Sequence, residues 1–245
     1  MSIWGKIIGG TAGFAIGGPI GAILGVMAGN LFDKSKKTKF NFNKISQQQK
    51  QNIFALSIII LSAKIAKSDG IVTKDEIEAF KEKFKIPSNE FNQVSKIFNE
   101  AKKSKFGYEK IAEQVGSLFS DNKLLLEELL NNLFYIAEAD GNISINEIEL
   151  LKSIAHSFHL KEEDFQRIFQ ARLQNNKSDP YKVLSVSRED SDSNIRKKWI
   201  LLNKEHHPDN LVAKGMPQEF IDVANEKMAQ INTAYENIQK QRSIS

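Results

Sequence analysis

The N-terminal part of the chain contains a run of 26 residues without a charge, from Ile7 to Phe32. About 20 apolar residues are enough for a helix to cross the hydrocarbon core of a bilayer. A secretory signal would have a shorter apolar segment and a small-residue cleavage site, and no convincing site precedes the lysines that follow. A flexible glycine-rich tail is the other alternative, because glycine is a poor helix former in water, but in lipid the backbone must bond internally. The run therefore predicts a retained, single transmembrane helix within residues 1–33.

Glycine recurs at every fourth position of this run, so that the glycines form one stripe along a helix. Patterns of this small-xxx-small kind let two helices approach closely in lipid. We therefore expect a parallel homodimer through the transmembrane helix. Its centre is predicted at Gly13, Gly17, Gly21 and Gly25.

Charge is distributed unevenly along the chain, whose formal net charge is +4. Residues 1–49 hold six lysines and one aspartate, and five of these lysines lie in a basic juxtamembrane linker at residues 34–46. Because lysine-rich flanks stay on the cytoplasmic side of a membrane, the bulk of the chain is expected in the cytoplasm, with a short N-terminus outside. The excess charge is confined to the N-terminus, so we expect no nucleic-acid-binding surface.

Two stretches, Ile65–Ile77 and Ile136–Ile148, match each other at an offset of 71 residues. In each, an apolar helical pattern ends at Asp-Gly, and a Ser or Thr follows with Glu three residues later. Asp-Gly favours a turn, and Ser/Thr-x-x-Glu is the capping box that begins a helix. The repeat therefore predicts two helical hairpins, each with a long apolar helix followed by a shorter amphipathic one. The predicted caps are Thr73 with Glu76 and Ser144 with Glu147.

The Asp-Gly turns have an alternative interpretation as calcium loops, because Asp, Gly and Glu match the second half of an EF-hand in spacing. Calcium requires six to eight oxygen ligands. The leading ligand positions, however, hold Ile65 and Lys67 in one copy and Ile136 and Glu138 in the other. Helix capping is therefore the favoured interpretation.

Other signs of catalysis or metal binding are weak. His156 and His159 lie about one helical turn apart, but a metal site would need further ligands from elsewhere in the chain. The sequence has no cysteine, no glycine-rich phosphate loop followed by Lys-Ser/Thr, and no convincing nucleophile–base set. We therefore expect neither an enzyme nor a bound metal ion or other cofactor.

With its repeated Asp-Gly turns, the stretch from residue 47 to residue 173 resembles the TerB-like helical domain. This resemblance implies an all-α bundle. The acidic turns could contact a partner, although such charges more often form a solvated surface. We expect this domain to be the one that binds a client protein.

A His-Pro-Asp triplet, His207-Pro208-Asp209, lies between two strongly helical stretches near the C-terminus. The preceding stretch is rich in lysine and arginine. The following stretch places apolar residues at helical spacing, at Ile231, Ala234, Tyr235 and Ile238. This pattern resembles the J domain of DnaJ-type co-chaperones, here over residues 179–245 after a short polar linker at 174–178. The resemblance implies a helical hairpin with a short flanking helix.

The resemblance to a J domain also implies a partner and a set of functional residues. The partner is DnaK, whose ATP hydrolysis the triplet would trigger. The basic face of the preceding helix would dock on DnaK, because positive charge raises the rate of association with an acidic surface. The docking residues implied are Arg196, Lys197, Lys198 and Lys204.

The docking helix departs from the usual J-domain pattern next to Trp199. A tyrosine followed by two basic residues is common at these positions, whereas Ile200 and Leu201 follow Trp199 here. Trp199 and Leu202 are expected to serve mainly as core. The departure leaves open a second interpretation, namely a membrane-anchored TerB-like scaffold whose J domain has lost its activity.

The order of the three parts resembles the membrane-anchored, DnaJ-like co-chaperones of the bacterial inner membrane. The stretch from Glu205 to Gly215 carries the most specific part of this resemblance. It implies an all-α protein with a single N-terminal transmembrane helix, a TerB-like helical bundle and a C-terminal J domain. The N-terminus would be periplasmic and both soluble domains cytoplasmic. Because the Gly/Phe-rich linker and zinc repeats of general DnaJ proteins are missing, the chain is expected to recruit DnaK to particular clients.

Overall fold

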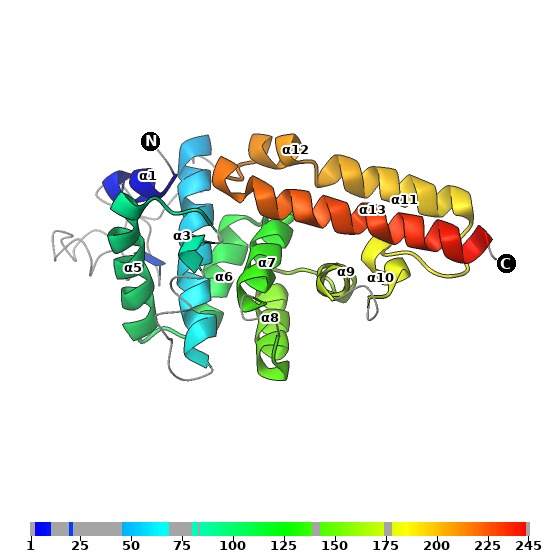
Figure 1. Ribbon diagram of the computed structural model, residues 1–245. Coiled ribbons are helices and arrows are strands. Elements are labelled where there is room, and N and C mark those ends of the chain that lie inside the picture. Colours follow the sequence, from blue (N-terminus) through cyan, green and yellow to red (C-terminus); the bar gives the residue numbers. More distant parts are fainter. Residues whose placement is uncertain are drawn as a thin grey trace.

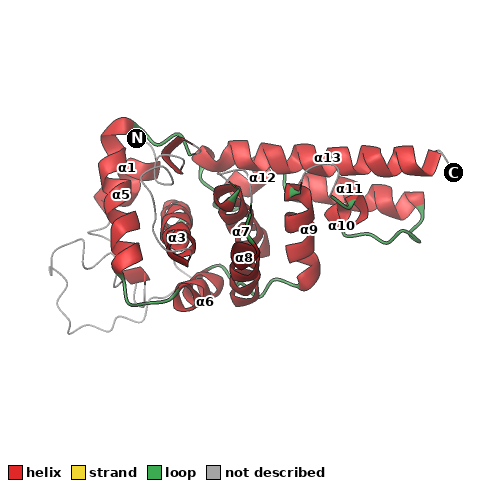
Figure 2. Ribbon diagram, turned by 60° about the horizontal axis from the view of Figure 1, so that its bottom comes forward, coloured by secondary structure: helices red, strands yellow, loops and turns green. Residues whose placement is uncertain are grey.

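The computed structural model describes residues 3–10, 20–21, 46–68, 80–82, 84–138, 143–173 and 178–243, and every regular element in these ranges is a helix (Figure 1, Figure 2). The predicted all-α fold class is confirmed for these residues. Most of the predicted transmembrane segment, including Gly13, Gly17 and Gly25, lies outside them. Among the described helices, none combines the length and the apolar character needed to cross a bilayer.

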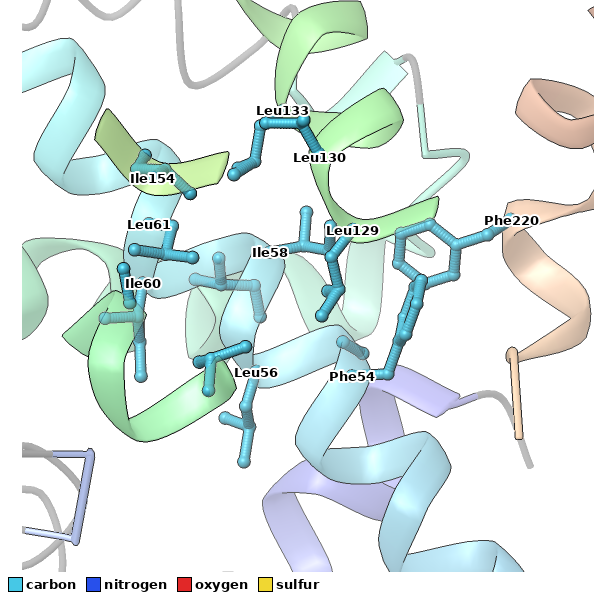
Figure 3. Close-up of a cluster of buried hydrophobic side chains, with 14 of the residues drawn as sticks. Phe54, Leu56, Ile58, Ile60, Leu61, Leu129, Leu130, Leu133, Ile154 and Phe220 are labelled. Carbon is cyan, nitrogen blue, oxygen red and sulfur yellow. The ribbon is translucent and has the colours of Figure 1, made fainter. Parts of the chain in front are cut away.

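The middle domain, residues 46–173, is built around one buried helix, α3 (Gln47–Ser68). Every residue from Asn52 to Ile65 is buried. A helix that is apolar on all sides is stable in water only when other elements surround it. Figure 3 shows apolar side chains of this helix meeting those of α7, among them Ile58 and Leu129. The surrounding helices are α5 (Ser88–Lys103), α6 (Tyr108–Leu118), α7 (Lys123–Ala137) and α8 (Ile145–Ser157).

The two long apolar helices of the sequence repeat, α3 and α7, pack against each other at the centre of the middle domain. The second repeat begins its short helix, α8, with the predicted capping box. The Ser144 N–H donates to Glu147 Oε2 at 2.8 Å, and the Glu147 N–H donates to Ser144 Oγ at 3.2 Å. The capping interpretation is therefore confirmed for this copy. The corresponding cap of the first copy, Thr73 with Glu76, lies outside the described residues.

One glycine allows α6 and α8 to approach each other closely. A Cβ atom on Gly116 would lie 2.3 Å from the backbone oxygen of Ser157 and 3.2 Å from the Cα atom of Phe158. Both of these atoms belong to the backbone, so no side-chain rotation could relieve the contact. The absence of a side chain at Gly116 therefore sets how closely the two helices pack.

The helix α1 (Ile3–Gly10) packs against the middle domain. Trp4 is fully buried there, and its ring centroid lies 6.4 Å from those of Phe80 and Phe84. The sequence-based division places residues 1–33 in one membrane-spanning unit, whereas α1 shares the core of the middle domain.

The C-terminal domain, residues 178–243, is the predicted helical hairpin. Its two long helices, α11 (Asp192–Glu205) and α13 (Ile221–Ser243), lie side by side (Figure 1). The predicted apolar face of α13 is buried against α11, and Tyr235 stacks on Trp199 with ring centroids 4.4 Å apart. Leu202 is buried in the same core, which confirms its predicted role. The shorter helices are α10 (Pro180–Leu184), α12 (Pro208–Ala213) and η3 (Gln218–Phe220).

The two domains share apolar cores. The ring of Phe220 lies in the core of the middle domain, with centroids 5.2 Å from Phe54 and 5.0 Å from Phe84 (Figure 3). Conversely, Ala171 is buried in the core of the C-terminal domain. Other C-terminal residues buried in the middle-domain core are Leu211, Met216, Val223 and Ala224. Helix α13 consequently extends across both domains (Figure 2).

The helix α9 (Glu162–Arg172) forms the boundary between the two domains. The chain segment that enters the C-terminal domain is bonded back to this helix. The Ser178 hydroxyl donates to the carbonyl oxygen of Gln170 at 2.8 Å, and the Asp179 N–H donates to Gln170 Oε1 at 2.9 Å. The C-terminal domain is therefore attached to α9 through hydrogen bonds as well as through the chain.

Candidate functional site

The His-Pro-Asp triplet forms a tight corner between α11 and α12. His207 is the N-cap of α12, and its Nδ1 atom accepts a hydrogen bond from the Asp209 N–H at 3.3 Å. Pro208 occupies the first helical position, where a missing N–H costs nothing and the fixed φ angle suits a helix. Asn210 closes the corner by donating from Nδ2 to the carbonyl oxygen of Glu205 at 2.7 Å. The triplet thus begins a short helix.

The two ionisable side chains of the triplet are open to solvent. The side chain of His207 is 52% exposed and that of Asp209 is 94% exposed, whereas Pro208 is buried. The proline therefore fixes the turn from inside, and the imidazole and the carboxylate face outwards. A protein partner could contact both groups without any rearrangement of the corner.

The predicted docking residues lie on α11, the helix that leads into the triplet. Arg196, Lys197 and Lys204 are exposed, and Lys198 is half-buried. Within the part of the chain that the structure describes, none of these four cations forms an ion pair. Their charge is therefore available to an acidic surface on another molecule.

Apolar side chains interrupt this basic face. Ile200 is 50% exposed and Leu201 is 45% exposed. Their neighbour Trp199 is partly buried, and its Nε1 donates to Asn232 Oδ1 at 2.8 Å. The outward face of α11 is thus a mixture of positive charge and aliphatic surface.

His206, next to the triplet, points the opposite way from His207. Its imidazole is buried between α7 and α13, with Nδ1 lying 2.9 Å from Glu128 Oε1. Lys227 Nζ lies 2.6 Å from the same carboxylate oxygen. Both Glu128 and Lys227 are themselves buried. Glu128 of the middle domain thus binds His206, which caps the C-terminal end of α11, and Lys227 on α13.

The other side of the His206 ring faces a second buried ion pair. Arg167 NH2 lies 2.6 Å from Glu127 Oε2, and Arg167 NH1 lies 3.4 Å from His206 Nε2. A neutral imidazole protonated on Nδ1 fits this arrangement, because Nδ1 then donates to Glu128 and Nε2 accepts from Arg167. The two carboxylates are matched by two cations, as buried charges require.

Burial and the charges of neighbouring side chains determine the pKa values of His206, Glu127 and Glu128. Burial lowers the pKa of His206, and the neighbouring charge of Lys227 lowers it further, so the imidazole stays neutral. Burial alone would raise the pKa values of the two glutamates. Arg167 and Lys227 outweigh this effect for Glu127 and bring its pKa to about 2. Lys227 and His206 hold the pKa of Glu128 well below its usual range.

The far end of α12 is also bonded to the middle domain. Gln47 Nε2 donates to the carbonyl oxygen of Val212 at 3.0 Å, and Asn122 Nδ2 donates to that of Lys214 at 3.0 Å. Both carbonyls lie at the end of α12, where the backbone oxygens of a helix are no longer bonded by a following helical turn. Gly215 follows with a φ angle of 115°, which a residue with a side chain rarely adopts. Both ends of α12 therefore contact the middle domain.

Sequence reasoning found the triplet and the exposed cations but missed the buried network. One signal was present, since Glu127 and Glu128 stand together inside the otherwise apolar helix α7. Charged residues on an apolar helix face are seldom buried without partners. Their partners, however, lie 40 to 99 residues away in the chain, where no local pattern could indicate them.

The two histidines considered as metal ligands, His156 and His159, are exposed. Among the described residues, no group of three or more histidine, aspartate or glutamate side chains is arranged to hold a metal ion.

Comparison with known protein families assigns each of the three parts. Residues 1–49 match the model described as the transmembrane domain of the co-chaperone DjlA. Residues 55–170 match the tellurite resistance protein TerB, and residues 179–244 match the DnaJ domain. No solved structure shows a significant match.

Whole-length relatives carry the same description, co-chaperone protein DjlA. The protein from Photobacterium profundum is 28% identical, with 99% of this chain and all of the relative covered. The Escherichia coli protein is 26% identical over the full length of both chains. The Vibrio cholerae protein is 30% identical, again over the full length of both. Because a relative that is 30% identical over the full length of both chains carries this description, and because residues 179–244 match the DnaJ domain, the chain belongs to the DjlA family of J-domain co-chaperones.

Proposed function

We propose that this protein is anchored in the bacterial inner membrane, stimulates the ATPase of DnaK through its J domain, and recruits DnaK to particular clients there. One observation carries the proposal: the imidazole of His207 and the carboxylate of Asp209 face solvent at the end of a helix with unpaired cations. Arg196, Lys197 and Lys204 would steer an acidic partner towards the triplet, because unscreened charge raises association rates. Lys198 would contribute through its exposed part.

The test is the rate at which DnaK hydrolyses ATP in the presence of the full chain in detergent. The full chain is used because the proposal concerns the membrane-anchored protein. The wild type should accelerate hydrolysis, and His207→Gln should return the rate to that of DnaK alone with the helix content unchanged. His156→Gln, at another exposed histidine, should stimulate as the wild type does. Equal stimulation by His207→Gln and the wild type would overturn the proposed role of the triplet.

The exposed aliphatic pair on α11 favours a second candidate. Ile200 and Leu201 stand where a J domain commonly carries basic residues, so the protein could be a membrane-anchored TerB-like scaffold whose J domain no longer acts on DnaK. In that case the wild-type chain would keep its helical fold and leave the ATPase of DnaK unchanged at every concentration.

The proposed topology has the N-terminus in the periplasm and both soluble domains in the cytoplasm. In the membrane, this topology requires α1 with Trp4 to leave the middle-domain core that it shares in the structure. The lysines that follow the uncharged run support this orientation. Since the chain has no cysteine, single cysteines can be placed at will. In intact spheroplasts, a membrane-impermeant maleimide should label Ser2→Cys and spare Ser245→Cys until the cells are lysed. The opposite pattern would reverse the orientation, and protection of both cysteines until lysis would show that α1 stays packed on the middle domain.

We further propose that the transmembrane helix forms a parallel homodimer through Gly13, Gly17, Gly21 and Gly25. Replacing Gly17 and Gly21 with Leu should preserve insertion, because Leu is more apolar, and should reduce cross-linking in membranes by separating the backbones. Ala12→Leu with Ala15→Leu is the control, since both positions lie about 150° around the helix from Gly17. Undiminished cross-linking of the double glycine variant would show that the stripe serves another purpose.

We propose that the TerB-like domain, residues 47–173, binds the client protein. The J domain is proposed to comprise residues 179–245. Clients captured by cross-linking the wild-type chain in membranes should lose their association with DnaK when His207 is replaced by Gln. Clients that associate with DnaK equally in both strains would show that recruitment does not pass through this protein.

A further inference from the structure

The short helix that begins with the triplet is held by the middle domain at both ends. At its N-terminal end, His206 bonds Glu128 of α7, and at its C-terminal end Gln47 and Asn122 bond the last carbonyls. Between these contacts the apolar side of α12, which includes Leu211, lies in the middle-domain core. The position of the triplet is thus determined by residues outside the C-terminal domain.

The buried network also fixes how the corner that carries the triplet is oriented. Glu128 accepts hydrogen bonds from His206, the C-cap residue of α11, and from Lys227 on α13. A single carboxylate thus fixes the position of the corner relative to α13. Charge-assisted hydrogen bonds of this length have narrow geometric requirements. Because Glu128, Lys227 and His206 are all buried, a displaced partner leaves a buried charge unpaired, which disfavours alternative placements.

We infer that the middle domain positions the His-Pro-Asp triplet, with Glu128 and Lys227 as the positioning residues that act through His206. The inference rests on the proposed action of the triplet on DnaK. It assigns the TerB-like region a role within the J-domain reaction itself, in addition to any client binding. Of the docking cations on α11, Arg196, Lys197 and Lys204 are exposed and Lys198 is half-buried. Among the described residues, no hydrogen bond or ion pair joins their side chains to the network, so partner binding and triplet orientation are separable.

Two measurements on the full chain in detergent test the inference. Glu128→Gln removes the charge that faces Lys227 and weakens the bond to His206. The maximal stimulation of DnaK should fall about tenfold or more, because small displacements of reacting groups have large effects on rate. The DnaK concentration for half-maximal stimulation should stay the same. Hydrogen–deuterium exchange of the backbone of residues 207–214 should become at least about tenfold faster as α12 loosens.

Glu138→Gln is the matched control. Glu138 follows the end of the same helix, α7, and pairs with Arg172 at 2.6 Å without touching His206 or Lys227. This variant should match the wild type in both measurements. If Glu128→Gln also matches the wild type in both, the positioning role is overturned.

A second variant decides the matter if Glu128→Gln fails to fold. Glu128→Gln with Lys227→Met removes both charges and leaves no unpaired ion, so it should fold. Faster exchange in residues 207–214 of this variant supports positioning by the network, and wild-type exchange with full stimulation overturns it. Should the wild type itself leave DnaK unstimulated, the proposed function fails, and the exchange measurement still decides whether Glu128 and Lys227 hold the triplet in place.

Discussion

The ring of Phe220 lies edge-on to the ring of Phe54 with centroids 5.2 Å apart, although the two residues come from different domains. Phe220 precedes the last helix of the J domain, and Phe54 lies on the central helix of the TerB-like domain. Aromatic pairs of this kind stabilise a core beyond the area that they bury. The pair therefore makes the stability of one domain depend on the other.

The first prediction is that the two domains unfold together. Trp4 and Trp199 are the two tryptophans of the chain, and they lie in different cores. The variants Trp4→Phe and Trp199→Phe each retain a single tryptophan, whose fluorescence reports on one core. The urea unfolding transitions of the two variants should coincide. When Phe220→Ala is added to each of these variants, the free energy of unfolding should fall by about 3–5 kcal/mol in both. A shift seen by Trp4 alone would show that the cores are independent.

The second prediction concerns the contact between α6 and α8. Gly116→Ala would force a Cβ atom against the backbone of Ser157 and Phe158, so it should destabilise the protein by about 1–3 kcal/mol through overpacking. Ser117→Ala is the control, because Ser117 is exposed on the same helix next to Gly116 and the change should leave stability close to that of the wild type. Urea unfolding monitored by circular dichroism measures both. Equal stability of the two variants would mean that α6 moves away at little cost.

The third prediction is a loss of stability in weak acid. The pKa of His206 is lowered by folding from its ordinary value of 6.5, so the unfolded chain binds a proton that the folded chain rejects. The stabilisation is complete above pH 6.5 and is lost as the pH falls below it. Glu127 and Glu128, whose folded pKa values are lowered from 4.5, extend the loss below pH 4.5.

The measurement is the midpoint of thermal unfolding at several pH values between 7.5 and 5. The midpoint should fall across this range in the wild type. His206→Gln should have a lower midpoint at pH 7.5, because Glu128 loses its bond, and a flatter dependence on pH. An unchanged slope in the variant would assign the acid sensitivity to other groups.

The fourth prediction concerns the docking helix. Lys197→Glu should raise the DnaK concentration for half-maximal stimulation several-fold at low salt, because a reversed charge slows association with an acidic surface. The difference from wild type should shrink as salt screens the charge. Lys182→Glu changes net charge equally at an exposed position of α10 and should leave the value unaltered. Identical effects of both variants would point to net charge alone.

Local patterns sufficed to predict much of the fold. The cap formed by Ser144 and Glu147 and the buried face of α13 with Ile231 and Ile238 depend on spacings of three to seven residues. The exposure of His207 and Asp209 also follows from their place at a helix start. Each of these features is determined by neighbours in the sequence, and for that reason the sequence pattern was informative.

The packing between domains could not be predicted in this way. Glu128 and Lys227 are 99 residues apart, and neither is marked by its neighbours as a member of a pair. The stretch from Leu211 to Ala224 is too short and irregular to show which core its apolar residues enter. A division of the chain into separate parts assumes that each part buries its own apolar residues, and Phe220 shows that this assumption fails here.

The position of Phe220 near the end of the chain has a consequence for synthesis. Domains usually fold in order as they leave the ribosome, the N-terminal ones first. Here the core around Phe54 and Phe84 remains open until the segment containing Phe220 has been translated and released. A nascent chain would expose these aromatic rings during most of its elongation, and one truncated before Phe220 would expose them permanently. The middle domain thus completes its apolar core only near the end of synthesis.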